Sequence, residues 1–133
     1  MLGLMMDKPL LISDLIARAE RHHGDTQVVS RDWQGRVERH DYASIHERAR
    51  HLGDALLKRG VVAGDRIATL AWNGHRHLEC YYAISGIGAV THTVNPRLFP
   101  EQISWIVNDA QDAILFFDPS LTELMDRLHG EFG

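Results

Sequence analysis

The chain has 133 residues, of which 44% are hydrophobic and 24% are charged, and its formal net charge is −4. A chain of this length and composition is not intrinsically disordered and is long enough to bury a real core. Its acidic balance and its lack of long basic runs exclude a nucleic-acid-binding surface of the usual kind.

The cysteine usage and the N-terminal segment favour a reducing, cytoplasmic setting. The single cysteine, Cys80, excludes an intramolecular disulfide. In the N-terminal segment, Asp7, Lys8 and Asp14 interrupt the apolar residues and no basic residues precede them, so we expect no signal peptide. No window approaches the roughly 18 apolar residues of a membrane span, so an integral membrane protein is not expected.

Two elements are predicted before residue 41. Residues 12–23 read as a short amphipathic helix, with Ser13 as its N-cap and Gly24 as its stop. Residues 26–31 and 36–40 contain valines and flank a glycine-containing connection, which predicts a β-hairpin.

The longest predicted helix begins after Asp41, which is its expected N-cap, and ends at Gly60. Its apolar residues recur at spacings of three and four and form one stripe, namely Tyr42, Ile45, Ala49, Leu52 and Leu56. We expect Gly60 to adopt positive φ at the helix end, and Asp65 to form local hydrogen bonds in the turn before the next strand.

From residue 66 onward the pattern alternates strand and helix three times. Strands are predicted at 66–72, 89–94 and 113–117, and helices at 75–85, 100–110 and 121–128. Apolar strands that alternate with helices indicate a parallel sheet covered on both faces. The predicted fold is therefore α/β, a three-layer parallel sheet (βαβαβα) preceded by an N-terminal helix, a β-hairpin and a helix.

The paired glycines Gly86 and Gly88 resemble the start of a dinucleotide-binding fingerprint, but Thr91 stands where the third glycine belongs. They also end a helix and open a strand, the reverse of the order that phosphate binding requires. We interpret them as a close helix–strand connection.

The histidine and cysteine groupings lack the spacing of known metal sites. His46 and His51 are five residues apart, one more than a zinc-protease helix requires, and are interpreted as solvated. His77 and Cys80 lie at i and i+3, but no second ligand pair accompanies them, so Cys80 is interpreted as a small buried hydrophobe.

The remaining carboxylates are interpreted as local. Asp109 and Asp112 bracket a helix end, and Asp65 lies in a turn beside Arg66. Spacing alone therefore identifies no catalytic, cofactor-binding or metal-binding residue.

Several segments together resemble the N-terminal part of the acyl-CoA synthetases in the adenylate-forming, AMP-binding superfamily. The resemblance runs from about residue 12 to residue 128. Its most specific segments are the turn at 60–68, GVVAGDRIA, and the run Asn95-Pro96-Arg97-Leu98. Further matches lie at 86–90 and 115–119. The segment Arg76-His77-Leu78-Glu79 and the pair His92-Thr93 look most like the medium- and long-chain fatty-acyl ligases.

The resemblance implies a two-step reaction for the parent enzyme. ATP and a carboxylate form an acyl-adenylate and pyrophosphate with Mg²⁺, and the thiol of coenzyme A then displaces AMP. The phosphate-binding loop, the adenylate motif, the hinge and the catalytic lysine of that family all lie downstream of this stretch. We therefore expect residues 1–133 to be the N-terminal portion of the AMP-binding large domain, with no second domain, no ATP, Mg²⁺ or coenzyme A site of its own and no activity alone.

Two alternatives remain open at the level of sequence. The first is that the chain is a stand-alone dimerisation or interaction module derived from the same fold, since a three-stranded sheet leaves two open edges. The second is a small nucleotide-binding α/β domain, with Asn73 and Asn95 at strand ends. The expected partners are the remainder of the parent enzyme and a second copy, held through sheet edges or the N-terminal surface, with a fatty acid as substrate of the parent only.

Overall fold

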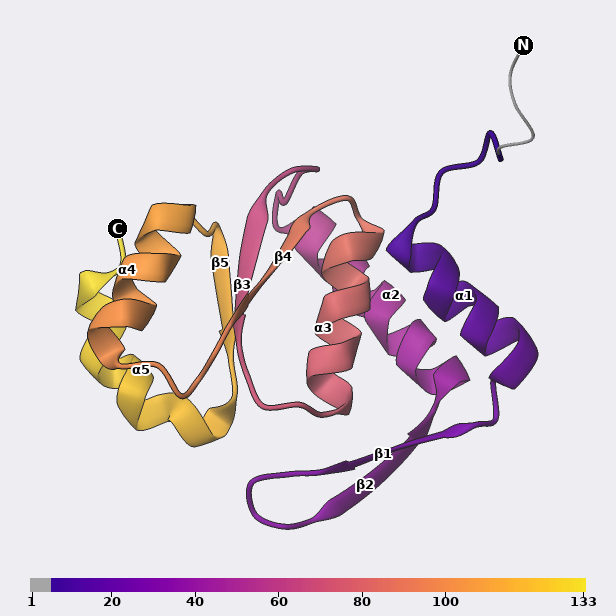
Figure 1. The fold of residues 1–133 in the computed structure, drawn as a ribbon, viewed down its shortest axis with the longest axis horizontal. Helices are drawn as coiled ribbons and strands as arrows, with labels where there is room; N and C mark the ends of the chain where they lie inside the picture. Colours follow the sequence, from indigo (N-terminus) through magenta and orange to yellow (C-terminus); the bar gives the residue numbers. More distant parts are fainter. Residues whose placement is uncertain (1–5) are drawn as a thin grey trace.

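The structure, a computed structural model, describes residues 6–133 and contains the elements in the predicted order (Figure 1). The first half comprises α1 (Ile12–His23), β1 (Gln27–Arg31), β2 (Val37–Asp41) and α2 (Tyr42–Lys58). The second half comprises β3 (Arg66–Leu70), α3 (His75–Gly86), β4 (Val90–Val94), α4 (Pro100–Ala110), β5 (Ile114–Phe117) and α5 (Thr122–Leu128). Short 3₁₀ turns, η1 (Pro119–Leu121) and η2 (His129–Glu131), flank the last helix.

The main sheet is parallel and has the strand order β4-β3-β5. Helices α2 and α3 cover one face of it, and α4 and α5 cover the other (Figure 1). This arrangement confirms the predicted three-layer α/β fold. Strands β1 and β2 form a separate antiparallel hairpin, with Ser30 opposite Glu38 and Val28 opposite His40.

Two apolar clusters hold the layers together, one on each side of β3. Alternate β3 residues point to opposite faces, so Ile67 packs with Leu56 of α2 and Ile84 of α3, while Leu70 packs with Ile103 of α4. All of these side chains are at most 2% exposed. Burying each stabilises the fold by about 1.5–3 kcal/mol, and β3 therefore lies at the centre of the core.

The caps of the first two helices differ from each other. Asp41 caps α2 as predicted, because its carboxylate accepts from the backbone N–H of Ser44 at 2.8 Å and the Ser44 hydroxyl lies 3.2 Å from the Asp41 N–H. The prediction that Ser13 caps α1 is wrong. The N-cap is Leu11, which offers no side-chain oxygen, and Ser13 lies inside the helix.

The glycine joints behave as interpreted from the sequence. Gly60 follows α2 with φ of +89°, and Gly88 follows α3 with φ of +80°. A Cβ at Gly88 would lie 3.3 Å from the Cβ of Ala63, which is a tight contact. Glycine therefore suits this position both for its positive φ and because it has no side chain. In the turn, the Asp65 carboxylate accepts from the backbone N–H of Val62 at 2.9 Å.

Element ends differ slightly from the predictions. The first core strand ends at Leu70 and not at residue 72, because the chain leaves the sheet before Trp72. Within residues 6–133, no helix is long and apolar enough to cross a membrane. The expectation about a signal peptide concerns in part residues 1–5, which lie outside the described residues.

Candidate functional site at the ends of two parallel strands

The carboxyl ends of β3 and β5 meet at the point where the chain connections diverge. Strand β3 is central, and the chain passes first to β4 on one side and then to β5 on the other. In open α/β sheets, ligands bind in the crevice outside the strand ends at such a switch point. A ligand site is therefore expected beside the segments that follow these strands, 71–74 and 118–120.

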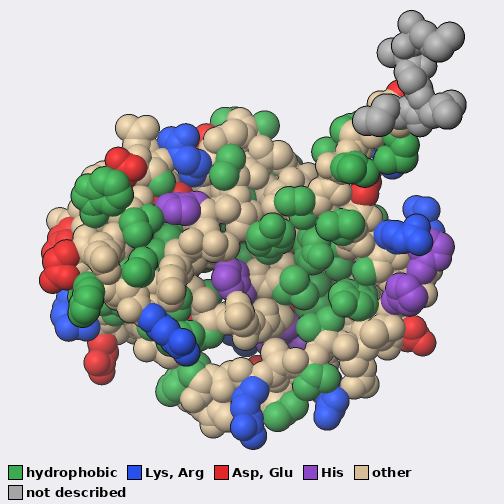
Figure 2. Space-filling view, viewed as in Figure 1, with side chains coloured by type: hydrophobic (Ala, Val, Ile, Leu, Met, Phe, Trp, Pro, Cys, Tyr) green, Lys and Arg blue, Asp and Glu red, His purple; other side chains and the backbone are tan. Residues whose placement is uncertain are grey.

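A cavity of about 540 Å³ lies at this position, between the sheet end and the β1–β2 hairpin. Figure 2 shows the molecule hollowed there, with histidine side chains visible in the hollow. Its wall combines aromatic rings with polar groups that converge from separate elements, which is the composition of small-molecule sites. The lining residues that matter below are Arg31, Glu38, Thr69, Trp72, His75 and His77.

Hydrogen bonds tie the two strand-end loops to each other. The indole N–H of Trp72 donates to the Ser120 hydroxyl at 2.9 Å, and that hydroxyl donates to the Asp118 carboxylate at 2.6 Å. The backbone N–H of Ser120 donates to the same carboxylate oxygen at 2.9 Å. The floor of the cavity is thus held by a continuous network and not by packing alone.

A threonine–histidine pair lies at the sheet end of the cavity. The hydroxyl of Thr69, which is fully buried, lies 3.0 Å from Nε2 of His77. Burial lowers the pKa of the His77 imidazole, which favours its neutral form. The pair therefore presents hydrogen-bonding groups without a fixed charge.

A second histidine cluster joins the hairpin to the start of α3. His75 lies 2.8 Å through Nδ1 from the Ser30 hydroxyl, and its ring stacks on that of His40 with centroids 4.2 Å apart. Glu38 approaches both rings, at 3.6 Å from Nε2 of His40 and 3.5 Å from Nε2 of His75. Burial and then the neighbouring His40 lower the pKa of His75.

The charged residues near the cavity divide into paired and unpaired groups. Arg36 pairs with Asp32 at 2.7 Å, and Arg48 pairs with the buried Glu79, also at 2.7 Å. Arg31 lines the cavity and has no ion-pair partner among residues 6–133. Positive charge is thus available to an anionic ligand at the hairpin side.

Cys80 lines the same cavity, and its thiol reactivity is a direct test of the packing. Burial, and then the charge of Glu79, raise the pKa of the Cys80 thiol from 9.0 to about 11. At pH 8 the thiolate is therefore about 100-fold scarcer than in the unfolded chain, since each pKa unit is a factor of ten. We expect iodoacetamide to alkylate the native chain at least about 100-fold more slowly than the urea-unfolded chain.

The native alkylation rate should still rise at pH 10, where the unfolded chain has passed its midpoint. Because the chain has a single cysteine, mass spectrometry follows the reaction without ambiguity. A native rate that levels off below pH 9.5 would contradict the buried placement.

The histidine and cysteine groupings singled out in the sequence are not brought together. His51 is exposed as expected, but His46 is not simply solvated: its Nδ1 lies 2.6 Å from a Glu20 carboxylate oxygen, so that interpretation is wrong for His46. His77 bonds to Thr69, and no metal-ligating group within residues 6–133 contains both it and Cys80.

The acidic pair at the end of α4 also differs from the expectation. Asp112 does more than bracket a helix end, because its side chain is fully buried and lies 2.7 Å from Nδ1 of His92. Its other oxygen has no hydrogen-bond partner in the described part of the chain. The sequence carried no signal for this pair, since the residues are 20 positions apart.

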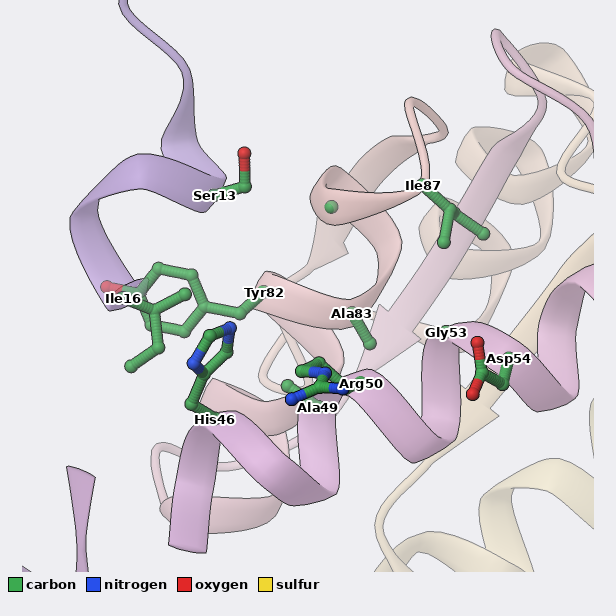
Figure 3. A pocket seen from close by; sticks show the side chains of 11 residues that line it. Ser13, Ile16, His46, Ala49, Arg50, Gly53, Asp54, Tyr82, Ala83 and Ile87 are labelled. Atoms are coloured by element: carbon green, nitrogen blue, oxygen red, sulfur yellow. The ribbon is translucent and has the colours of Figure 1, made fainter. Parts of the chain in front are cut away.

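A smaller cavity of about 240 Å³ lies within the helical layer, between α1, α2 and α3. Figure 3 shows Ile16 of α1 beside the ring of Tyr82 of α3, with His46 beneath that ring and Arg50 further along α2. These residues come from packed helices and not from strand ends, so the cavity at the ends of β3 and β5 is the better candidate site.

Fold and cavity define this chain as an open parallel α/β unit with a ligand-sized crevice at its switch point. Comparison with known proteins makes the class specific. The family model described as AMP-binding enzyme matches residues 15–131, and the chain belongs to that family.

Its similarity to characterised relatives extends over nearly the whole chain. The 3-methylmercaptopropionyl-CoA ligase of Ruegeria lacuscaerulensis is 55% identical over 98% of the chain, and the medium-chain-fatty-acid–CoA ligase of Ectopseudomonas oleovorans is 46% identical over 98%. The chain spans about a quarter of the length of these curated relatives, 24% in both cases.

Solved structures show the same fold at lower sequence similarity. The anthranilate CoA ligase AuaEII, solved with anthranoyl-AMP, superposes with a TM-score of 0.82 at 19% identity, over 95% of this chain and 24% of that one. The backbone arrangement described above is therefore that of a known part of adenylate-forming ligases.

Proposed function

We propose that the chain is the N-terminal portion of an ATP-dependent fatty-acyl-CoA ligase and that its role is to supply the first sheet and the switch-point cavity of that enzyme. The observation that carries the proposal is the 55% identity, over 98% of the chain, to a ligase that joins an acid to coenzyme A. The relatives act, by their names, on acids from 3-methylmercaptopropionate to medium-chain fatty acids. The common feature of these substrates is a carboxylate on an unbranched apolar chain.

The proposed reaction has two balanced steps. The carboxylate attacks the α-phosphorus of ATP and pyrophosphate leaves. The acyl carbon then carries AMP, a good leaving group, in place of the carboxylate oxygen, which is a poor one. The thiol of coenzyme A then loses its proton to solvent and its sulfur adds to the acyl carbon, and AMP leaves as the thioester forms. The residues described here would position the reactants and supply charge. We assign none of them as a nucleophile, general acid or general base.

Mg²⁺, which this chemistry implies, does not fit the donors that the chain brings together. Among residues 6–133, the group of three His, Cys, Asp or Glu side chains whose ligand atoms converge is Glu38, His40 and His75. Two of its three ligands are imidazoles, whereas Mg²⁺ requires oxygen ligands. We therefore derive no Mg²⁺-dependent step from this chain and expect it to be inactive alone.

A chimera tests the proposed role directly. This chain replaces the matching quarter of the Ruegeria lacuscaerulensis ligase, and the product is assayed for 3-methylmercaptopropionyl-CoA with ATP, the acid and coenzyme A. We expect the chimera to form the thioester, because the two segments share 55% of their residues. The chain alone and the remaining three quarters alone are the matched controls, and both should be inactive.

The outcome that contradicts the proposal is a chimera that folds, as shown by a cooperative thermal transition, but forms no thioester with any of three acids. The acids are 3-methylmercaptopropionate, octanoate and palmitate. Activity of the chain alone would contradict the proposed scaffold role in the opposite direction.

For partners, we propose the remainder of the ligase and a second copy of the chain. The outer edges of β4 and β5 carry no further strand among the described residues, so each offers unpaired backbone groups. Light scattering of the isolated chain tests the pairing with a second copy. A chain that is monomeric at about 50 μM contradicts this pairing.

A further inference from the structure

The β1–β2 hairpin presents three polar side chains on one face. Residues i and i+2 of a strand point the same way, so Glu38 and His40 share a face of β2. Ser30 lies directly opposite Glu38 in the hairpin register and therefore projects from that same face. Local sequence thus groups a hydroxyl, a carboxylate and an imidazole.

The start of α3 brings a second imidazole to this face. His75 is the first residue of the helix and is only 6% exposed. The hydroxyl of Ser30 lies 2.8 Å from Nδ1 of His75, which leaves Nε2 of the ring directed toward Glu38. A hydrogen bond to the distal ring nitrogen is the usual second contact of a histidine that binds a metal.

The ligand atoms of these residues are close to the spacing that one metal ion requires. Two ligands at about 2.1 Å from Zn²⁺ lie about 3.0–3.4 Å apart for bond angles of 90–109°. The Glu38 carboxylate oxygen lies 3.6 Å from Nε2 of His40 and 3.5 Å from Nε2 of His75, which is too long for hydrogen bonds. All three ligand atoms lie within 4.8 Å of one another.

We propose that Glu38, His40 and His75 bind one divalent transition-metal ion of the Zn²⁺ class at the mouth of the switch-point cavity. Two imidazoles and one carboxylate suit such ions, whereas Mg²⁺ and Ca²⁺ prefer oxygen ligands. Because Glu38 and His75 line the cavity, the remaining coordination positions face it and are open to water or to an anionic ligand.

Binding requires one movement. The rings of His40 and His75 are stacked with an interplanar angle of 29°, so their Nε2 lone pairs run side by side and do not yet converge. The terminal torsion of histidine is broad, and the His40 side chain is 25% exposed, so its ring has room to turn. Metal binding therefore breaks the stack, and this change is observable.

The first experiment titrates the 133-residue chain with ZnCl₂ by isothermal calorimetry, with MgCl₂ as the comparison ion. We expect one Zn²⁺ per chain and no heat from Mg²⁺. Imidazole proton NMR should show the His40 and His75 signals lose their mutual ring-current shifts as Zn²⁺ is added. Unchanged signals for both rings at saturating Zn²⁺ overturn the proposal.

The chain has nine histidines in total, and variants separate His40 and His75 of this site from the others. Glu38→Gln and His40→Gln should each remove the one-to-one binding, and Ser30→Ala should weaken it about 10- to 100-fold because the His75 ring loses its orienting contact. His51→Gln, on the exposed surface of α2, is the matched control and should bind as the unaltered chain does.

Folding is monitored separately so that loss of binding has one meaning. Each variant must keep the cooperative thermal transition of the unaltered chain in the absence of metal. If a ligand variant loses this transition, Ser30→Ala is used for the test in its place. Equal Zn²⁺ affinity in Glu38→Gln and the unaltered chain, or equal loss in His51→Gln, would overturn the proposal and assign the binding to scattered surface imidazoles. None of these readouts depends on ligase activity.

Discussion

Replacing Leu56 by alanine lowers the free energy of unfolding of this chain by about 3 kcal/mol, because the change leaves a cavity that the surrounding residues only partly fill. Leu56 lies on α2, is 2% exposed and packs against Ile67 of the central strand and Ile84 of α3. The loss should appear as a lower urea midpoint with an unchanged slope, measured by circular dichroism at 222 nm.

The neighbouring residue provides the matched control. Leu57 is on the same helix and is 51% exposed, so Leu57→Ala makes the same chemical change outside the core. We expect a change within about 0.5 kcal/mol for it. Similar losses at both positions would mean that α2 does not pack on the sheet through the face described here.

His92→Leu should cost about 2–3 kcal/mol, since it removes the hydrogen-bond partner of a buried carboxylate. The Asp112 side chain is fully buried, its Oδ2 lies 2.7 Å from Nδ1 of His92, and its Oδ1 has no partner among residues 6–133. Without His92 the whole carboxylate group is left without a hydrogen bond in the protein. Urea unfolding at pH 7 measures the loss.

A double-mutant cycle identifies the cause of that loss. His92→Leu combined with Asp112→Leu removes both polar groups, and we expect the pair to be less destabilised than the sum of the two single variants. His51→Leu, at an exposed position, controls for the change of a histidine to leucine. Strictly additive effects would show that the two side chains do not interact in solution.

Much of the fold could be predicted because its causes are local. The apolar stripe of α2 recurs at the helical period, and a stripe of that kind must be buried on one side whatever it packs against. Asp41 and Gly60 mark the ends of that helix through their own conformational preferences. Local preference failed at Ser13, since a serine near a helix start does not identify which residue is the cap.

The site could be predicted much less well because its contacts are not local. The predicted hairpin did not single out Glu38 or His40, and nothing in their neighbourhood indicates His75, which follows a different strand. Its bond to Ser30 spans 45 residues. The spacing rules applied to His46 and His51, or to His77 and Cys80, examine single helices and cannot detect a cluster built from a hairpin and a helix.

By itself, therefore, the sequence determined the element order, the layered α/β class and the resemblance to acyl-CoA synthetases, because periodicity, turn residues and short motifs are properties of neighbouring residues. Only the tertiary structure decided the strand order β4-β3-β5, and with it the cavity at the ends of β3 and β5. It also decided that His75 meets Glu38 and that His92 meets Asp112. Such pairs depend on how layers pack, and packing energies are summed over residues far apart in the chain.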